Sequence, residues 1–259
     1  MGVKRALTLS QVKTLFPSYT FSSLIPSTSG VMDTTYISDK YVIKFYERDI
    51  KEKISLDAML LEHLSDGGLN VPQLLAHTDG WYLYDKLRGK VPKTIHLFHI
   101  QALARFMARF HAKGLHCSED FLKSYAIKDT LLKIKRSNYR FYKELEILKD
   151  YKPKNDGFIH GDLFRDNTVF DGQTIGVFDF IDGGNGSYVF DIAVALLSFN
   201  TSKRKSYIRI FLNTYNQTAA KKISQKELLD TIKIASLFYG MLRISEQSDV
   251  KRAKELIFW

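Results

Sequence analysis

Residues 158–184 read FIHGDLFRDNTVFDGQTIGVFDFIDGG, and this stretch decides both the fold and the chemistry that we expect. His160 and Asp162 form a His-x-Asp sequence, and Asn167 follows after four intervening residues. Asp179 lies further on, in the strand-like GVFDF. Phosphoryl transfer mainly requires a group that orients the attacking hydroxyl and hard oxygen ligands for magnesium. Asp162 suits the first task, and Asn167 with Asp179 suits the second. We expect His160 to brace the loop rather than to carry a proton.

The segments on either side of this stretch have different patterns. Residues 1–87 contain β-branched and aromatic runs separated by turn-like sequences, with one helical pattern over residues 51–65. An Asp-Gly pair between two later apolar runs predicts a tight hairpin. Residues 88–259 are helical in pattern apart from the short β-rich stretch quoted above. We therefore predict an α+β fold with a small β-rich N-lobe over residues 1–87 and a larger helical C-lobe over residues 88–259.

A lysine in an apolar strand pattern is a second candidate for the site. Lys44 lies in the sequence YVIKFY, which would bury or half-bury its ammonium opposite the phosphates of a nucleotide. A buried lysine requires a partner carboxylate. The helix that follows offers Asp57, with Glu52 and Glu62 as alternatives. A lysine that extends its ammonium to solvent from a strand would have the same local pattern.

The segment before Lys44 is rich in small and hydroxyl residues. It reads STSGVMDTTY over residues 27–36, and its backbone N–H groups and hydroxyls could cover phosphates. The candidates there are Ser29, Gly30, Thr34 and Thr35. An ordinary polar turn has the same composition. The order of lysine, helix acid, His-x-Asp, asparagine and aspartate along the chain is what favours a kinase site.

Composition narrows the function class only in part. The formal net charge of +10 would suit a nucleic-acid binder, a protein at an anionic membrane or an enzyme that acts on phosphates and carboxylates. Basic and apolar residues interleave over residues 128–154 as in an amphipathic helix with a solvated face. No compact basic-aromatic module is present, so a nucleic-acid partner is not expected.

Three further features bear on the cellular setting. The single cysteine, Cys117, cannot form an internal disulfide. No apolar run approaches the roughly 20 residues that a membrane helix needs. The first residues do not have a signal-peptide pattern. We expect a cytoplasmic protein without a membrane partner, and the sequence leaves its oligomeric state open.

Taken together, these motifs resemble the aminoglycoside phosphotransferase and choline kinase superfamily, a branch of the protein-kinase-like bilobal fold. The resemblance spans nearly the whole chain. The sequences GVMDTTY, HGDLFRDN, GVFDF and LFYGMLRI are most similar to the homoserine kinase type II branch. The spacing from Asp179 to Asp191 also resembles the superfamily. The resemblance implies a phosphotransferase that uses ATP and Mg²⁺ and acts on the alcohol group of a small molecule.

The resemblance also implies a role for particular residues. It implies that Asp162 is the catalytic base, that Asn167 and Asp179 bind magnesium, and that Lys44 contacts the α- and β-phosphates. It further implies that the backbone of Asp85 to Leu87 contacts adenine, that Arg243 and Asp182 contact the acceptor, and that Asp191 has a structural role. Two departures matter here. The helix acid is usually Glu, so Asp57 is short for its task. No activation segment ending in an APE-like motif follows Asp179, so a protein-kinase function is not expected.

The acceptor is predicted from the last part of the chain, which lines the acceptor pocket in this superfamily. Residues 201–259 contain 12 Lys and Arg against 5 acids, a charge that disfavours a polycationic aminoglycoside. Choline would need an aromatic cage, for which the candidates are Tyr188, Phe190, Phe238 and Tyr239. Homoserine fits both the motifs and a carboxylate-bearing acceptor. The alternatives are choline, ethanolamine or an aminoglycoside as acceptor, or a kinase-like protein that binds ATP without catalysis.

Overall fold

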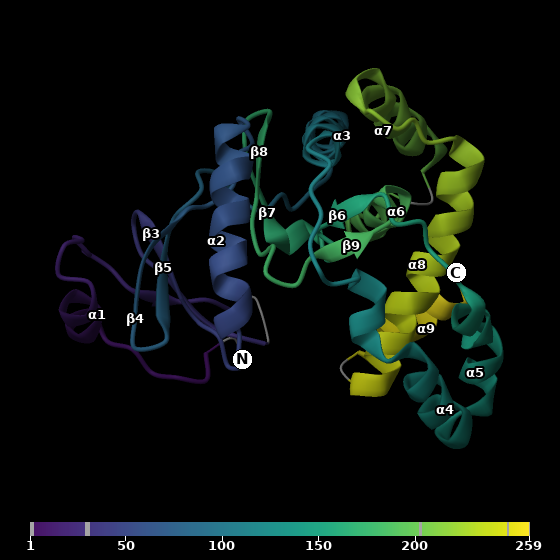
Figure 1. The fold of residues 1–259 in the computed structure, drawn as a ribbon, viewed down its shortest axis with the longest axis horizontal. Coiled ribbons are helices and arrows are strands. Elements are labelled where there is room, and N and C mark those ends of the chain that lie inside the picture. The colour runs from purple at the N-terminus through teal and green to yellow at the C-terminus, as the bar shows by residue number, and fades with distance from the viewer. Residues whose placement is uncertain (1–2, 29–31, 202–203, 248, 259) are drawn as a thin grey trace. The chain divides into compact units, whose positions relative to one another are not determined.

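The computed structural model describes residues 3–28, 32–201, 204–247 and 249–258. The chain forms two compact units, one made of Met1–Val91 with Thr168–Ile181 and the other of Pro92–Asn167 with Asp182–Trp259 (Figure 1). The first unit contains an antiparallel sheet, and the second is mainly helical. We call them the sheet unit and the helical unit.

The sheet of the sheet unit has the strand order β1-β2-β3-β5-β4, with every neighbouring pair antiparallel. Its strands are β1 (Ile25–Pro26), β2 (Thr34–Ile37), β3 (Tyr41–Phe45), β4 (Leu74–Thr78) and β5 (Trp81–Asp85). The last two strands are joined by the Asp-Gly turn that the sequence predicts. Asp79 and Gly80 both have positive φ, 50° and 79°, as the tight type I′ turn of a twisted hairpin requires.

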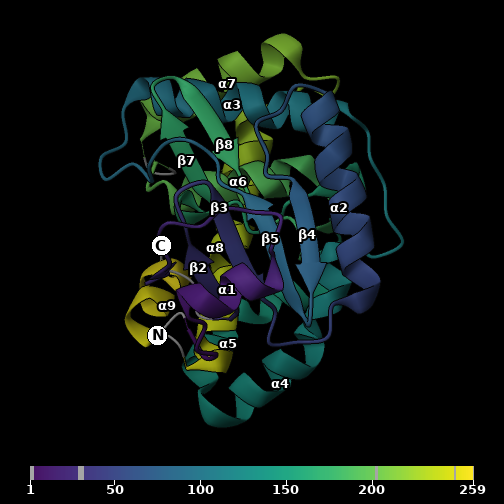
Figure 2. The same cartoon turned by 90° about the vertical axis from the view of Figure 1, so that its left-hand side faces the viewer.

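The two faces of this sheet carry different side chains, because side chains alternate along each strand. Ile43, Leu83 and Trp81 point to one face and form a core with the short helix α1 (Leu9–Leu15), which contributes Val12. Figure 2 shows α1 lying across the strands on that side. Lys44 points to the opposite face. That second face therefore holds the candidate lysine, and the first holds the larger core cluster that packs on α1.

Helix α2 (Lys51–Asp66) covers the face that bears Lys44 (Figure 1). It begins and ends close to the predicted bounds of 51–65. Its Ile54 packs on a small cluster formed by Tyr46, Ile50 and Ile181, to which Tyr82 of the sheet also belongs. The helix thus encloses the lysine face with apolar and aromatic side chains.

A second hairpin, β7 (Thr168–Asp171) with β8 (Thr174–Val177), also belongs to the sheet unit. Lys90 forms a bridge with Phe170 through two backbone hydrogen bonds of 2.9 and 3.1 Å. A side chain at Gly89 would collide with the backbone of Phe170, since its Cβ would lie 2.5 Å from the carbonyl atoms. The hairpin falls within the predicted lobe of residues 88–259, but it belongs to the sheet unit, and only its long-range pairing with Lys90 reveals this.

The helical unit is built around helix α6 (Tyr188–Ser198), in which every residue from Tyr188 to Leu197 is buried. A helix that is apolar on all sides has to be enclosed by other elements. Strand β6 (Gly157–Ile159) and helix α8 (Gln225–Glu246) lie against it (Figure 1). Helix α3 (Leu97–Ala112) lies beside α7 (Lys205–Thr218), and α9 (Val250–Ile257) lies beside α8. The elements of the unit are α3 (Leu97–Ala112), η1 (Phe121–Tyr125), α4 (Ile127–Ser137), α5 (Tyr139–Leu145), η2 (Glu146–Asp150), β6 (Gly157–Ile159), η3 (Arg165–Asn167), β9 (Gly184–Gly186), α6 (Tyr188–Ser198), α7 (Lys205–Thr218), α8 (Gln225–Glu246) and α9 (Val250–Ile257). Among the described residues, none of these helices combines the length and apolar character of a membrane span.

Candidate active site

Lys44 forms an ion pair with Asp179, with Nζ 2.8 Å from Oδ1. The lysine side chain is 14% exposed and the aspartate side chain 34%. Burial acts to lower the pKa of the Lys44 ammonium, but the adjacent Asp179 carboxylate outweighs it, so this pKa lies above its ordinary value. Two of the predicted site residues of the sheet unit, Lys44 and Asp179, therefore meet, and Lys44 stays protonated at neutral pH.

Asp179 has a backbone conformation that is uncommon outside glycine. Its φ is +71°, in the left-handed region that aspartate tolerates better than most residues. It follows strand β8 by two residues. Conformations of this kind are often found where a side chain must be aimed for function.

The acid predicted on the helix, Asp57, is buried in α2 with 7% of its surface exposed. Of the three acids considered for that role it alone is buried, because Glu52 and Glu62 are exposed. Burial, followed by the charges of Asp179 and Asp57, raises the pKa of Tyr46 well above its ordinary value. Lys44 forms its ion pair with Asp179, which follows the β7–β8 hairpin. The spacing of residues in the sequence did not indicate this pair.

Of the residues predicted to cover phosphates, Ser29 and Gly30 lie outside the described residues. Thr34 is fully buried, and its hydroxyl accepts hydrogen bonds from the backbone of Lys4 (2.8 Å) and Arg5 (3.1 Å) and donates one to Glu47 (2.7 Å). A hydroxyl has one donor and two acceptor positions, and these three bonds occupy them. Thr34 therefore anchors the N-terminal segment, and we do not retain it as a phosphate contact.

Thr35 lies directly opposite Lys44 in the register of β2 with β3, so the two side chains share one face of the sheet. At the end of β5, the backbone N–H groups of Asp85 and Lys86 donate to the carbonyls of Gln73 (3.2 Å) and Lys40 (2.8 Å). These two N–H groups are thus used within the chain. The adenine contact predicted for Asp85 to Leu87 has to use other backbone groups of the segment.

In the helical unit, the loop that carries Asp162 is held by the buried carboxylate of Asp191. Its Oδ1 accepts a hydrogen bond from the N–H of Gly161 (2.8 Å), and its Oδ2 accepts one from the N–H of His160 (3.2 Å). Asp191 and His160 are both fully buried. Gly161 has φ +74°, and a Cβ there would lie 2.0 Å from the ring of Phe121. The turn before Asp162 therefore requires glycine, and the Asp191 carboxylate holds its backbone through these two hydrogen bonds.

Asn167 closes the same loop onto Asp162. Its Nδ2 donates to the Asp162 carbonyl at 2.8 Å and lies 3.4 Å from the carboxylate Oδ2. The Asp162 carbonyl also accepts from the N–H of Phe164 at 2.6 Å. The amide oxygen of Asn167 makes no hydrogen bond within the described part of the chain. Asn167 thus orients the loop with its nitrogen and keeps its oxygen available as a ligand.

His111 contacts Asp191 through a ring nitrogen, and the sequence motifs did not indicate it as a site residue. Its Nε2 lies 3.1 Å from Asp191 Oδ2 and its Nδ1 lies 2.9 Å from the hydroxyl of Tyr215. Burial, followed by the Asp191 charge, raises the pKa of Tyr215 above its ordinary value, so this phenol is protonated and can donate to Nδ1. The ring then donates from Nε2 to the carboxylate. The signal in the sequence was a histidine in the last turn of the helix, on its mostly apolar buried face.

Arg243, on helix α8, lies close to the loop of Asp162. Its guanidinium carbon is 5.8 Å from the ring centroid of Phe164 and 5.9 Å from that of Tyr239, and its Nη1 donates to the Tyr239 carbonyl (3.3 Å). The Tyr239 hydroxyl donates to the carbonyl of Gly161. Burial, followed by the Asp162 charge, raises the pKa of Tyr239 well above its ordinary value. Arg243 is therefore within the same part of the helical unit as Asp162.

The other acceptor candidates differ in their surroundings. Asp182 is half-buried in the short segment before β9. The four aromatic residues considered as a choline cage are each at most 6% exposed. Phe190 and Phe238 pack edge to face with centroids 5.7 Å apart, and Tyr188 stacks on His111 at 4.2 Å. These rings are buried and pack on one another or on His111, so their faces are largely covered by other side chains.

Residues 26–222 match the sequence profile described as the phosphotransferase enzyme family. The chain belongs to this family. The phosphotransferase is 28% identical over 196 residues to a homoserine kinase of Polaromonas naphthalenivorans, in an alignment that covers 64% of this chain and 62% of that relative. It is 24% identical to a homoserine kinase of Methylobacillus glycogenes, with coverage of 95% and 84%. Among solved structures, an aminoglycoside phosphotransferase with bound ADP superposes with a TM-score of 0.61 at 19% identity, covering 97% of each chain.

These comparisons confirm three predictions made from the sequence. The phosphotransferase has the predicted protein-kinase-like α+β fold, since it shares that fold with the solved aminoglycoside phosphotransferase. It belongs to the predicted superfamily, and the relatives named above are homoserine kinases, as the predicted branch required. The predicted enzyme class, a phosphotransferase, is confirmed by the family itself.

Proposed function

We propose that this phosphotransferase transfers the terminal phosphoryl group of ATP to the hydroxyl of a small molecule, and that homoserine is the acceptor. The observation that carries the proposal is the loop from His160 to Asn167, in which Asp191 fixes the backbone on one side of Asp162 and Asn167 closes the other. A base that is held in this way can orient an alcohol without a change in the fold.

In the proposed reaction Asp162 is the base. The hydroxyl oxygen of the acceptor forms a bond to the terminal phosphorus, and the bond between that phosphorus and the bridging oxygen of ATP breaks. The carboxylate of Asp162 takes the hydroxyl proton. Lys44, which is protonated, neutralises phosphate charge together with its neighbour on the same face, Thr35, as a hydroxyl donor. ADP leaves with the charge that the broken bond places on it.

The residues proposed as magnesium ligands suit that ion. Within the described residues no group of three or more His, Cys, Asp or Glu side chains forms a metal cage. Magnesium is usually held by one or two protein oxygens together with substrate phosphates and water, so a cage is not what it needs. We propose Asp179 and the amide oxygen of Asn167 as these ligands. The bound ion would neutralise charge on the phosphates during transfer.

Support for homoserine comes from the relatives and from one side chain. The homoserine kinases named above align with 64% and 95% of this chain. Arg243 lies near the loop of Asp162 and could pair with the α-carboxylate of an amino acid through two parallel hydrogen bonds. The buried, filled aromatic cluster gives choline no such partner.

For the nucleotide, the solved aminoglycoside phosphotransferase was crystallised with ADP, which supports nucleotide use here.

The test is a measurement of ADP release with magnesium and ATP against homoserine, choline, ethanolamine, methylthioribose and kanamycin. We expect turnover with homoserine to exceed that with the others by at least tenfold. Turnover only with choline or kanamycin would replace the acceptor but keep the kinase. A folded protein that binds ATP and phosphorylates none of them would contradict the proposal.

A further inference from the structure

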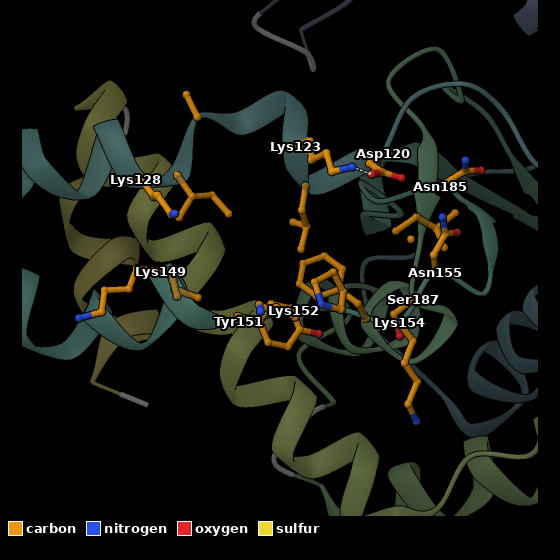
Figure 3. A pocket seen from close by; sticks show the side chains of 18 of the residues that line it. Asp120, Lys123, Lys128, Lys149, Tyr151, Lys152, Lys154, Asn155, Asn185 and Ser187 are labelled. Carbon is orange, nitrogen blue, oxygen red and sulfur yellow. Dashed lines mark ion pairs between the residues drawn. The ribbon is translucent and has the colours of Figure 1, made fainter.

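The helical unit contains a cavity of about 650 Å³ that the chemistry above does not use (Figure 3). It lies between the first turn of α4, the loop of residues 148–155 and the β6–β9 pair. Its size falls in the range of sites that hold small organic molecules. Figure 3 shows Lys128 and Lys149 on one side of the cavity and Asp120 and Asn185 on the other.

The lining combines an apolar floor with a basic rim. Leu148, Ile159 and Phe190 are buried and form part of the floor, and Tyr151 adds a ring beside Phe190 with centroids 6.5 Å apart. The charged side chains of the lining are five lysines against two aspartates. They are Lys123, Lys128, Lys149, Lys152 and Lys154, with Asp120 and Asp129. A ligand that matches this lining has an apolar body and a negative charge.

Two of the lysines are available for such a charge. Lys123 pairs with Asp120, and Lys154 pairs with Glu227, which is not part of the lining, at 2.8 Å. Lys149 Nζ lies 3.9 Å from the Asp150 carboxylate. For Lys128 and Lys152 no ion pair exists within the described residues. Both are exposed and sit at the cavity. Their ammonium groups can therefore meet an anion without breaking an internal pair.

A layer of aromatic rings lies between this cavity and the loop of Asp162. Phe190 lines the cavity and packs on Phe238, whose ring centroid is 5.2 Å from that of Tyr239. The Tyr239 hydroxyl in turn donates to the carbonyl of Gly161. Neither Asp162 nor Arg243 lines the cavity. The cavity is therefore a different place from the proposed acceptor contact.

We propose that this cavity is a second binding site, which takes a small amphipathic anion. The ligand would place an aromatic or aliphatic body on the floor around Phe190 and Ile159 and a carboxylate, sulfonate or phosphate near Lys128 and Lys152. Burial of the apolar body supplies most of the binding, and the two ammonium groups select the anion. The site does not depend on which acceptor the phosphotransferase uses.

The probe for this site is 8-anilinonaphthalene-1-sulfonate, an apolar ring system that carries one negative charge. We expect the folded chain of residues 1–259 to bind it with saturable fluorescence and a stoichiometry near one by calorimetry. The Lys128→Gln, Lys152→Gln double variant should weaken binding by about fivefold, from two exposed charge contacts. Asn155→Trp, which adds a large side chain at the cavity, should abolish the saturable phase.

A matched control is the Lys133→Gln, Lys143→Gln double variant, which removes the same charge from exposed positions outside the lining and should leave binding unchanged. N-phenyl-1-naphthylamine, which lacks the sulfonate, should be insensitive to the lysine variants. ATP with magnesium should not displace the sulfonate probe. The proposal is wrong if ATP displaces all of the probe, or if the cavity variants and the control variant bind it equally while all remain folded by circular dichroism.

Discussion

Replacement of Asp191 by asparagine should destabilise the protein and, separately, slow its turnover. The carboxylate is fully buried and accepts three hydrogen bonds, from the N–H of Gly161 (2.8 Å), the N–H of His160 (3.2 Å) and Nε2 of His111 (3.1 Å). An asparagine has only one oxygen, so its amide nitrogen must face at least one of these donors. The change keeps the shape of the side chain and alters only its hydrogen-bonding pattern.

The size of the effect follows from these contacts. A buried donor left without a partner costs about 1–3 kcal/mol, and the remaining bonds lose the strength that the charge gave them. We expect a loss of about 2–4 kcal/mol in the free energy of unfolding, a large share of the roughly 5–15 kcal/mol of a typical domain. Because Gly161 precedes Asp162, a displaced turn would misplace the proposed base, and a shift of about 1 Å can cost about 10²-fold in rate.

The assay is urea denaturation followed by circular dichroism, together with kcat and KM for ATP and the acceptor. Leu196→Ala serves as the matched control, since Leu196 is fully buried on the same helix and its truncation costs about 2–5 kcal/mol by leaving a cavity. We expect both variants to lose similar stability and only Asp191→Asn to lose kcat at a temperature where both are folded. Wild-type stability in Asp191→Asn, or equal kcat in the two variants, would refute the positioning role of this carboxylate.

Four further outcomes test the remaining assignments. Asp162→Asn should lower kcat by about 10² to 10⁴ and leave ATP affinity measured by calorimetry unchanged, whereas a variant that keeps a third of the activity would exclude this base. Asp179→Ala should raise the magnesium concentration for half-maximal activity, and an unchanged value would remove it from the metal ligands. Arg243→Met should raise KM for homoserine by about tenfold with KM for ATP unchanged, and a parallel loss of both would indicate a structural role. Burial, followed by the charge of His96, lowers the pKa of His99, whose Nδ1 accepts a hydrogen bond (3.0 Å) at the start of α3 and can do so only when unprotonated. The contribution of His99 to the free energy of unfolding is therefore present above the unfolded-state pKa of about 6.5 and is lost as the pH falls. The difference in free energy of unfolding between wild type and His99→Leu should shrink from pH 8 to pH 5.5. A difference that stays constant in urea denaturation would contradict this.

The amino-acid sequence determined the features that depend on neighbouring residues. The helix over residues 51–65 and the Asp-Gly hairpin follow from local periodicity and turn chemistry, and the structure has both. The sequence from His160 to Asn167 indicated phosphoryl transfer because a short loop has to hold its base and its amide ligand together. The family of the chain confirms the enzyme class.

Only the tertiary structure decided which distant side chains meet. Lys44 pairs with Asp179 across 135 positions of sequence, a contact that no local spacing indicates. His111 and Asp191 are 80 positions apart, and no local pattern joins them. The sequence favoured Thr34 as a phosphate contact, whereas its hydroxyl accepts hydrogen bonds from the backbone N–H groups of Lys4 and Arg5. Periodicity shows which face of an element is buried, but the identity of the partner on that face depends on packing between elements that are far apart in the chain.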